Sequence, residues 1–347
     1  MAVEILTVDD TYQFGLVAKY LARDDRSPRH DYGQLTGDPR AAILEAWRFP
    51  WVDAWFDPDD TAQRFNAVTF VHAADNGQPG ASVQIIGSFG ELHTPISLVP
   101  LADTHYSTLT LKIPKGEVHV YRMRIDGVWQ IDPINPQRVA LDNGAIWSRM
   151  FTWGATQRLS LERWEARLLE RLASHILPFQ TTDGKTFFSR VHNAQGPANR
   201  PPHAYRLDET IGAVNFIDKL LAREEAHHLI DYRICLELID QLLRARNPVT
   251  EPARLPREMI IELYTQMGSG NVPGWNYGRY GNPRYFLQLL RRHTLTGAFS
   301  HPRYGGNAMA LGWKYLEERY RDATGATLFD WARAIEPPLG RSPAYRG

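Results

Sequence analysis

Residues 299–316 read FSHPRYGGNAMALGWKYL, and this stretch carries the most specific pattern in the chain. Pro302 fixes one backbone turn, whereas Gly305 and Gly306 permit a positive φ or the close approach of another segment. Asn307 is a favourable N-cap for a helix that begins directly after it. The stretch therefore predicts a sharp loop that leads into a helix.

The helix predicted after this loop has one apolar stripe, formed by Met309, Trp313, Leu316 and Tyr320. Gly312 would let a second helix or backbone segment come close. Nothing in the loop or the helix requires these residues to carry out a reaction, so the residues alone indicate packing.

The same helical periodicity runs through most of the C-terminal half. Apolar residues recur at the spacing of one buried helix face at Leu161, Trp164, Leu168, Leu172 and Ile176. Further helices are predicted at 210–222, 229–246, 256–267 and 282–299. Residues 180–209 are rich in Pro, Gly and Asn. We predict a long loop there, of a length that is often functional or ordered by a partner.

Residues 61–155 follow a different period. Apolar and polar residues alternate at 64–74, 81–89, 106–114 and 118–130, and turn sequences such as DNGQPG and PKGE separate them. Short strands at this spacing favour a small β-sandwich. The sequence thus predicts a β-sandwich at 61–155, followed by an all-α domain at 156–347.

An aromatic-rich arm precedes the sandwich, at residues 1–60, with predicted helices at 10–22 and 39–49. Its most unusual part is the run WRFPWVDAWFDPDD at 47–60. These aromatic side chains either cover the core of the next domain or dock on a partner subunit. Both interpretations stay open at this point, because both remove large aromatic surfaces from water.

Composition excludes several classes of function. The 39 basic and 39 acidic side chains cancel, which gives no electrostatic basis for binding nucleic acid. A single cysteine, Cys235, rules out an internal disulfide framework and a cysteine-ligated haem or metal cluster. No segment reaches the ~20 apolar residues of a membrane span, and the first residues lack an export signal. We therefore expect a cytoplasmic protein, or a periplasmic one that a signal-bearing partner exports with itself.

The stretch at 299–316 resembles the signature of the small subunit, subunit 3, of gluconate 2-dehydrogenase. That signature is Phe-x-x-Pro-x-Tyr-Gly-Gly-Asn followed by Gly-Trp. It is matched by Phe299, Pro302, Tyr304, Gly305, Gly306, Asn307, Gly312 and Trp313. The segments HILPFQ, GAVNFIDKLLA and YFLQLLRRHTLTGAFS also resemble the family, so the resemblance covers roughly 158–325.

This resemblance implies an accessory role in a complex. In such complexes a large FAD-dependent subunit of the glucose–methanol–choline type oxidises a sugar or sugar acid, often together with a cytochrome c subunit. The small subunit supports the folding, export or active-site shape of the flavoprotein. We therefore expect no catalytic residue, no metal and no cofactor in this chain, and FAD in its partner.

The resemblance also suggests where the partner binds. We expect a large, apolar obligate interface formed by the loops at 180–209 and 268–307. His301 and Tyr304 are the residues best placed to reach into a partner's active site. The full set of candidates for contact with the partner is His301, Tyr304, Gly305, Gly306, Asn307 and Trp313.

A second resemblance concerns the β-rich region. Tyr121–Met123, Ile125–Trp129, Asp132-Pro133 and Asp142–Gly144 match in order the early-set immunoglobulin-like modules that bind glycogen, as in the β subunit of AMP-activated protein kinase. The fold implied is an immunoglobulin-like sandwich, similar to a carbohydrate-binding module. Leu92 replaces the first sugar-platform tryptophan of that family.

The carbohydrate-binding candidates are Arg122, Trp129 and Trp147. An indole face beside a guanidinium group could hold a pyranose ring, because the ring stacks on the indole and the charge binds hydroxyl groups. The other interpretation is structural: Trp129 packs over its hairpin, and Arg122 covers apolar surface with its stem. A role in subunit docking is the third possibility for this module.

Two further motifs resemble functional sites. In REEAHHLIDYR (223–233), Glu224 with His228 and His227 with Asp231 stand at the i,i+4 spacing of metal ligands. We interpret this segment as a solvated, salt-bridged face. The glycine-rich stretch at 267–286 follows a helix rather than a strand, so a dinucleotide-binding loop is excluded.

Two other functions compete with the accessory subunit. The first is a stand-alone enzyme of glycan or natural-product modification that uses the 268–307 loops as its pocket. The second is a carbohydrate-targeting protein that binds polysaccharide through the β module.

Overall fold

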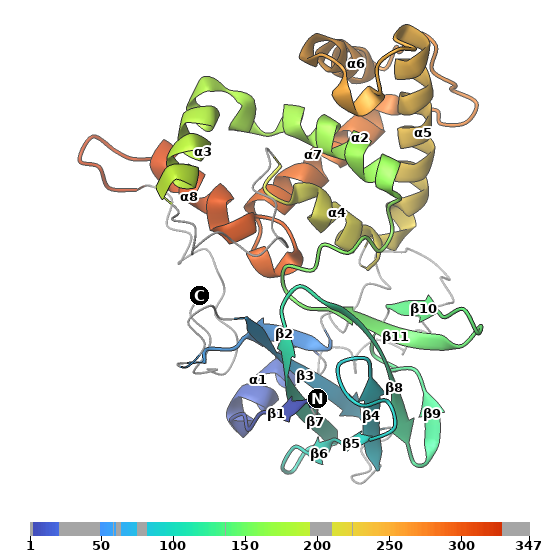
Figure 1. The fold of residues 1–347 in the computed structure, drawn as a ribbon, viewed down its shortest axis with the longest axis vertical. Coiled ribbons are helices and arrows are strands. Elements are labelled where there is room, and N and C mark those ends of the chain that lie inside the picture. The colour runs from blue at the N-terminus through green and yellow to red at the C-terminus, as the bar shows by residue number, and fades with distance from the viewer. Residues whose placement is uncertain are drawn as a thin grey trace. The chain divides into compact units, whose positions relative to one another are not determined.

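The computed structural model describes residues 3–20, 49–57, 59, 64–74, 82–135, 137–194, 210–223 and 225–327. These residues form two compact units, which divide between Gln157 and Arg158. The first unit is built mainly of strands and the second of helices, as Figure 1 shows. The predicted order of a β-rich region followed by a helical one is confirmed.

The β unit contains two antiparallel sheets. One sheet has the order β1 (Glu4–Ile5), β7 (Tyr106–Pro114), β3 (Phe65–Ala73) and β2 (Trp51–Ala54), with β6 (Val99–Pro100) also paired to β7. The other has the order β10 (Arg138–Ala140), β11 (Ile146–Phe151), β8 (Val118–Ile125), β4 (Val83–Gly87) and β5 (Ile96–Ser97), with β9 (Val128–Gln130) paired to β8.

Both sheets contribute side chains to one core. Phe70 of β3 and Leu111 of β7 pack there with Tyr121 and Met123 of β8. Side chains alternate across each strand, so one face of each sheet supplies this core while the other faces away. Two sheets with a shared core agree with the expected layering, whereas an immunoglobulin-like topology stays a prediction.

The N-terminal residues cover the other face of the five-stranded sheet. Helix α1 (Asp10–Tyr20) buries Tyr12 and Leu16 against Trp51 and Val71. The Tyr12 hydroxyl also donates a hydrogen bond to the buried Asp53 carboxylate of β2. Trp51, at least, covers the core of its own unit. The helix predicted at 39–49 lies outside the described residues, apart from Phe49.

The helical unit consists of seven α-helices in its described part, joined by short 3₁₀ turns (Figure 1). They are α2 (Arg163–Ile176), α3 (Thr182–Ala194), α4 (Ala213–Leu221), α5 (Leu229–Arg246), α6 (Arg257–Ser269), α7 (Pro283–Phe299) and α8 (Leu311–Arg319). Their main core contains Leu172, Ile217, Leu236, Leu263 and Phe286. The helices predicted from periodicity are confirmed. None of the helices described is long and apolar enough to cross a membrane.

The prediction of a loop at 180–209 is partly wrong, because residues 182–194 form helix α3. The Gly and Thr residues near its start reduce helix propensity, but Phe187 is buried against Phe179 and Tyr315. Tertiary packing therefore outweighs the local preference. The remainder of the predicted loop, 195–209, lies outside the described residues.

Candidate functional site

The first candidate site is the loop between α7 and α8, which consists of η8 (Pro302–Tyr304), η9 (Ala308–Ala310) and the residues between them. Asn307 is its central residue and is fully buried. Its amide nitrogen donates to the Ser300 carbonyl at 2.7 Å, and its amide oxygen accepts from the Gly312 N–H at 2.8 Å. Asn307 thus holds the end of α7 and the start of α8 together.

Two glycines allow the segments around Asn307 to approach one another. A Cβ atom at Gly306 would lie 2.1 Å from the carbonyl oxygen of Gly297, and one at Gly312 would lie 2.0 Å from that of Ala298. Both distances are far inside van der Waals contact, so only glycine fits at either position. The Trp313 indole N–H closes the arrangement by donating to the Phe299 carbonyl at 2.7 Å.

Helix α4 holds this loop from the other side. The Asn215 side chain donates to the Gly305 carbonyl at 2.8 Å and accepts from the Lys219 ammonium group at 3.1 Å. Lys219 is buried and paired with the equally buried Asp218 at 2.9 Å. The segment GAVNFIDKLLA, which the sequence marks as related to the signature, is therefore in direct contact with it.

His301 and Tyr304 are half-buried, unlike the glycines and Asn307. The His301 Nδ1 accepts a hydrogen bond from the Arg303 backbone N–H at 3.1 Å, and its ring lies against Trp313. Burial, together with the Arg303 charge, lowers the pKa of His301 to about 3. The Arg303 guanidinium group donates to the Tyr304 hydroxyl at 3.1 Å and lies over its ring.

The predicted partner contacts thus divide into two groups. Gly305, Gly306, Asn307 and Trp313 are buried and fix the backbone of the loop, while His301 and Tyr304 retain partial exposure. Contact of any of them with a partner stays a prediction. Of the predicted apolar stripe, Trp313 is buried and Leu316 is partly buried, whereas Tyr320 is exposed. Leu311 and Tyr315 are buried as well.

The carbohydrate-binding candidates lie on the six-stranded sheet. The Arg122 guanidinium group donates to the Trp129 carbonyl at 2.9 Å rather than lying over the indole. It is Arg124 that lies over the Trp129 ring, 5.8 Å from its centre. Arg124 pairs directly with Trp129 across β8 and β9, which accounts for this contact.

Trp147 shares a face with these residues. Its neighbour Ser148 pairs with Tyr121, and both Ser148 and Tyr121 are buried. Because side chains alternate along a strand, Trp147 and Arg122 point to the opposite face of the sheet. The sheet therefore brings Arg122, Trp129 and Trp147 to one face, together with Arg124.

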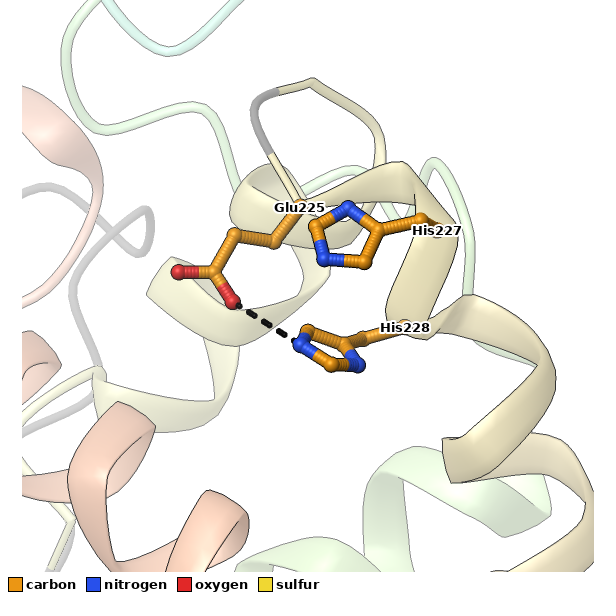
Figure 2. Close-up of side chains that lie close together, drawn as sticks. All are labelled: Glu225, His227 and His228. Carbon is orange, nitrogen blue, oxygen red and sulfur yellow. Dashed lines mark ion pairs between the residues drawn. The ribbon is translucent and has the colours of Figure 1, made fainter. Parts of the chain in front are cut away.

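A second candidate site lies where η6 (Ala226–His228) leads from α4 into α5. Three side chains there could each offer one atom to a metal ion: Glu225, His227 and His228. These three atoms lie within 4.8 Å of one another, and Figure 2 shows the arrangement of the side chains. The Glu225 carboxylate is 3.7 Å from the His228 Nε2. The His227 and His228 rings lie against one another, with centres 4.1 Å apart.

The cluster is fixed to α7 through Glu225. One carboxylate oxygen is 2.8 Å from the Nε2 of His293 and 2.6 Å from the Arg292 guanidinium group. The Nδ1 of His293 is 2.9 Å from the Tyr232 hydroxyl, within the core. A chain of contacts therefore runs from the core of the unit to Glu225.

Burial and neighbouring charges shift the pKa values of Glu225 and His293 in opposite directions. Burial lowers the pKa of His293, although the Glu225 carboxylate beside it opposes the effect. Burial alone would raise the pKa of Glu225. The hydrogen bond with His293 and the Arg292 charge outweigh burial, so the pKa of Glu225 lies below its usual value. Glu225 is thus a carboxylate at neutral pH.

The structure agrees with the salt-bridged part of the interpretation of 223–233 and departs from its solvated part. Only 13% of the His228 side chain is exposed. Glu224 lies outside the described residues, and the carboxylates beside His228 belong to Glu225 and Asp231. Helical i,i+4 spacing failed to identify this cluster because the residues precede α5 and occupy a 3₁₀ turn.

The family comparison concerns the helical unit. Residues 164–317 match the family model of gluconate 2-dehydrogenase subunit 3, so this part of the chain resembles that family. No curated protein matches the chain.

Two similar solved structures are esterases of enterobactin, and the chain spans about a third of each. The structure from Shigella flexneri, determined with enterobactin, is 17% identical over 28% of this chain and 32% of that one, with a TM-score of 0.24. The ferric enterobactin esterase from Salmonella typhimurium is 14% identical over 33% and 37%, with a TM-score of 0.26. Similarity at this level identifies no shared function.

Replacing Gly312 by Ala should lower the free energy of unfolding of the full chain by about 2 kcal/mol or more, because the new methyl group overlaps the Ala298 carbonyl oxygen. Gly268→Ala is the matched control, since Gly268 is also in a helix and has open space around its Cβ position. That control should be neutral or stabilising by up to ~1 kcal/mol. Urea unfolding followed by circular dichroism at the helix band measures both. Equal effects of the two substitutions would contradict the close packing of α7 and α8.

Stability should fall as the pH is lowered through the ordinary pKa of histidine. The pKa of His301 is about 3 in the folded chain, so the unfolded state takes up a proton first. Above pH ~6.5, His301 does not make the free energy of unfolding depend on pH. At pH ~4.5, its low pKa should reduce the free energy of unfolding by about 2–3 kcal/mol. His301→Asn, which retains an acceptor for the Arg303 N–H, should show a correspondingly weaker pH dependence in urea unfolding. An unchanged pH dependence of the free energy of unfolding would refute the lowered pKa of the half-buried His301.

Proposed function

We propose that this chain is the accessory subunit of a dehydrogenase complex whose large subunit is an FAD-dependent flavoprotein of the glucose–methanol–choline type. The flavoprotein oxidises a sugar, sugar acid or glycoside and passes the electrons to a cytochrome c or another acceptor. This chain binds no redox cofactor and keeps the flavoprotein in its active shape. The single observation that carries the proposal is the family match over residues 164–317.

The contacts of the signature residues support a role in shaping a surface. Asn307, Gly312 and Trp313 engage backbone groups of their own unit. Side chains used in this way set the path of a loop and do not react with a substrate. They are the residues a rigid docking surface needs, and this favours an accessory subunit over a stand-alone enzyme.

The loop between α6 and α7 is the best-defined surface for such a partner. Tyr277 links it internally, because its hydroxyl donates to the Gly270 carbonyl at 3.0 Å and accepts from the Val272 N–H at 2.8 Å. The Trp275 indole N–H donates to the Tyr280 carbonyl at 2.8 Å. The loop is therefore held in one shape, and aromatic side chains on such a preorganised surface are typical of stable interfaces.

Purification of the tagged chain from its own host should recover a second subunit with the absorption of oxidised flavin and with sugar dehydrogenase activity. Tyr285, which follows this loop in the first turn of α7, is 42% exposed and offers the interface an aromatic anchor. Tyr285→Glu should lower the recovered flavin about tenfold or more.

Val249→Glu is the matched control, because Val249 is apolar, 92% exposed and outside the proposed surface. It should leave flavin recovery unchanged. A chain that purifies alone from its host, and that oxidises or modifies a glycan without any flavoprotein, would instead identify a stand-alone enzyme.

A second candidate function is carbohydrate binding by the β unit. The observation that favours it is the shared face of Arg122, Trp129 and Trp147 on the six-stranded sheet. Indole rings on a sheet face, with guanidinium groups beside them, can stack on a sugar ring and bind its hydroxyl groups. Leu92, in place of the first platform tryptophan, is 47% exposed, so the platform would rest on the other two indoles.

Addition of maltoheptaose at millimolar concentration to the full chain should change its tryptophan fluorescence if this face binds sugar. Trp129→Ala should remove the change, because it deletes the stacking surface. Trp164→Phe, at a partly exposed tryptophan of the helical unit, should retain it. The absence of any response in the unmodified chain excludes this second function.

A further inference from the structure

We propose that Glu225, His227 and His228 bind one divalent transition-metal ion. The site belongs to the helical unit and lies at the turn between α4 and α5. The inference rests on the geometry of these side chains and does not depend on the proposed dehydrogenase complex.

The ligand atoms lie near the spacing of a metal site, and the same Glu225 oxygen also contacts His293 and Arg292. Two ligands at about 2.1 Å from one ion are roughly 3.0–3.6 Å apart at angles of 90–120°. The Glu225 carboxylate oxygen and the His228 Nε2 are 3.7 Å apart, longer than a hydrogen bond and close to this range. The contributing atom of His227 lies within 4.8 Å of both. Figure 2 shows the two rings one above the other, with the carboxylate to one side.

Both ring nitrogens of His228 have a carboxylate beside them. The Nδ1 is 2.7 Å from the Asp231 carboxylate, and the Nε2 is 3.7 Å from the Glu225 carboxylate. These two acidic groups favour a cation beside the ring.

Asp231 and His293 occupy the positions of supporting residues. A carboxylate on the far nitrogen of a ligating histidine fixes the ring and increases its basicity, as Asp231 does for His228. His293 fixes the Glu225 carboxylate in the same way from α7. Ligands held by second partners lose little entropy when the ion binds.

Two features oppose a cation at this position. The Arg292 guanidinium group occupies one Glu225 oxygen, and the N-terminus of α5 carries a partial positive charge. Arg292 is 55% exposed, so its side chain can turn into solvent when the ion arrives. The carboxylates of Glu225 and Asp231 offset the remaining repulsion. We therefore expect the site to be weaker with Arg292 than without it.

The donor set selects the class of metal. Two imidazole nitrogens and one carboxylate oxygen suit Zn²⁺, Co²⁺, Fe²⁺ or Ni²⁺, whereas Mg²⁺ and Ca²⁺ prefer oxygen ligands alone. Three protein ligands leave at least one coordination position open, for water or for a side chain of a bound partner. The bound ion would fix the turn between α4 and α5.

The test uses the full chain, freed of metal by a chelator and titrated with Zn²⁺ in competition with a chromophoric chelator. One equivalent should bind, and Co²⁺ should give the visible absorption of a four- or five-coordinate ion. His228→Ala should abolish both signals. Asp231→Asn should weaken Zn²⁺ binding about tenfold, since it acts through His228. Arg292→Gln should tighten binding several-fold, a gain that a purely structural role of the cluster would not produce.

The controls separate this site from general binding to histidine. His93→Ala, at an exposed histidine of the β unit, should leave Zn²⁺ affinity unchanged. Circular dichroism shows whether each variant folds. Tighter Zn²⁺ binding by Arg292→Gln could not result from misfolding, because a misfolded variant would lose affinity. Failure to bind one equivalent, equal loss in His93→Ala and His228→Ala, or no gain in Arg292→Gln would each overturn the proposal.

Discussion

The buried charge of Asp218 is the constraint on which the helical unit depends. Its carboxylate accepts the backbone N–H groups of Leu159, Ser160 and Leu161 at 2.8–2.9 Å, and it is paired with Lys219. Leaving one charge of a buried pair alone costs roughly 3–5 kcal/mol, so the two residues are kept together. Through Asn215 the same helix face reaches the Gly305 carbonyl. One face of α4 thus fixes both the first residues of the unit and its most specific loop.

That arrangement explains why the most specific stretch of the sequence, residues 299–316, holds backbone segments together and carries no evident catalytic group. Gly306 and Gly312 are required by the carbonyl oxygens they approach, and Asn307 by the two backbone groups it joins. Such requirements are strict because the space is fixed by backbone, which cannot move away as a flexible side chain can. A motif can therefore be highly specific and still serve only to shape a surface, as an accessory subunit needs.

Local pattern was enough to predict most of the fold, and it failed where distant residues decide. The helices with clear periodicity, such as α5 and α7, were predicted to within a residue or two because one face of each is buried. Helix α3 was missed because its sequence has little helix propensity, whereas its Phe187 is buried in a cluster with Phe179 and Tyr315 from elsewhere in the chain. Arg124 was missed as the partner of the Trp129 ring because strand register, not spacing in the chain, brings them together.

The histidine cluster shows the same limit for sites. Glu225 and His293 are 68 residues apart in sequence, and no local pattern relates them. Their contact fixes the end of α4 to α7, while near its start α4 meets Gly297 of α7 so closely that a Cβ there would lie 2.9 Å from Phe216. The pair of helices is therefore held near both ends, by close backbone packing at one and by charged and imidazole groups at the other. An ion between Glu225 and His228 would strengthen the second of these contacts, which lies at the opposite end of α4 from the close packing of Gly297 against Phe216.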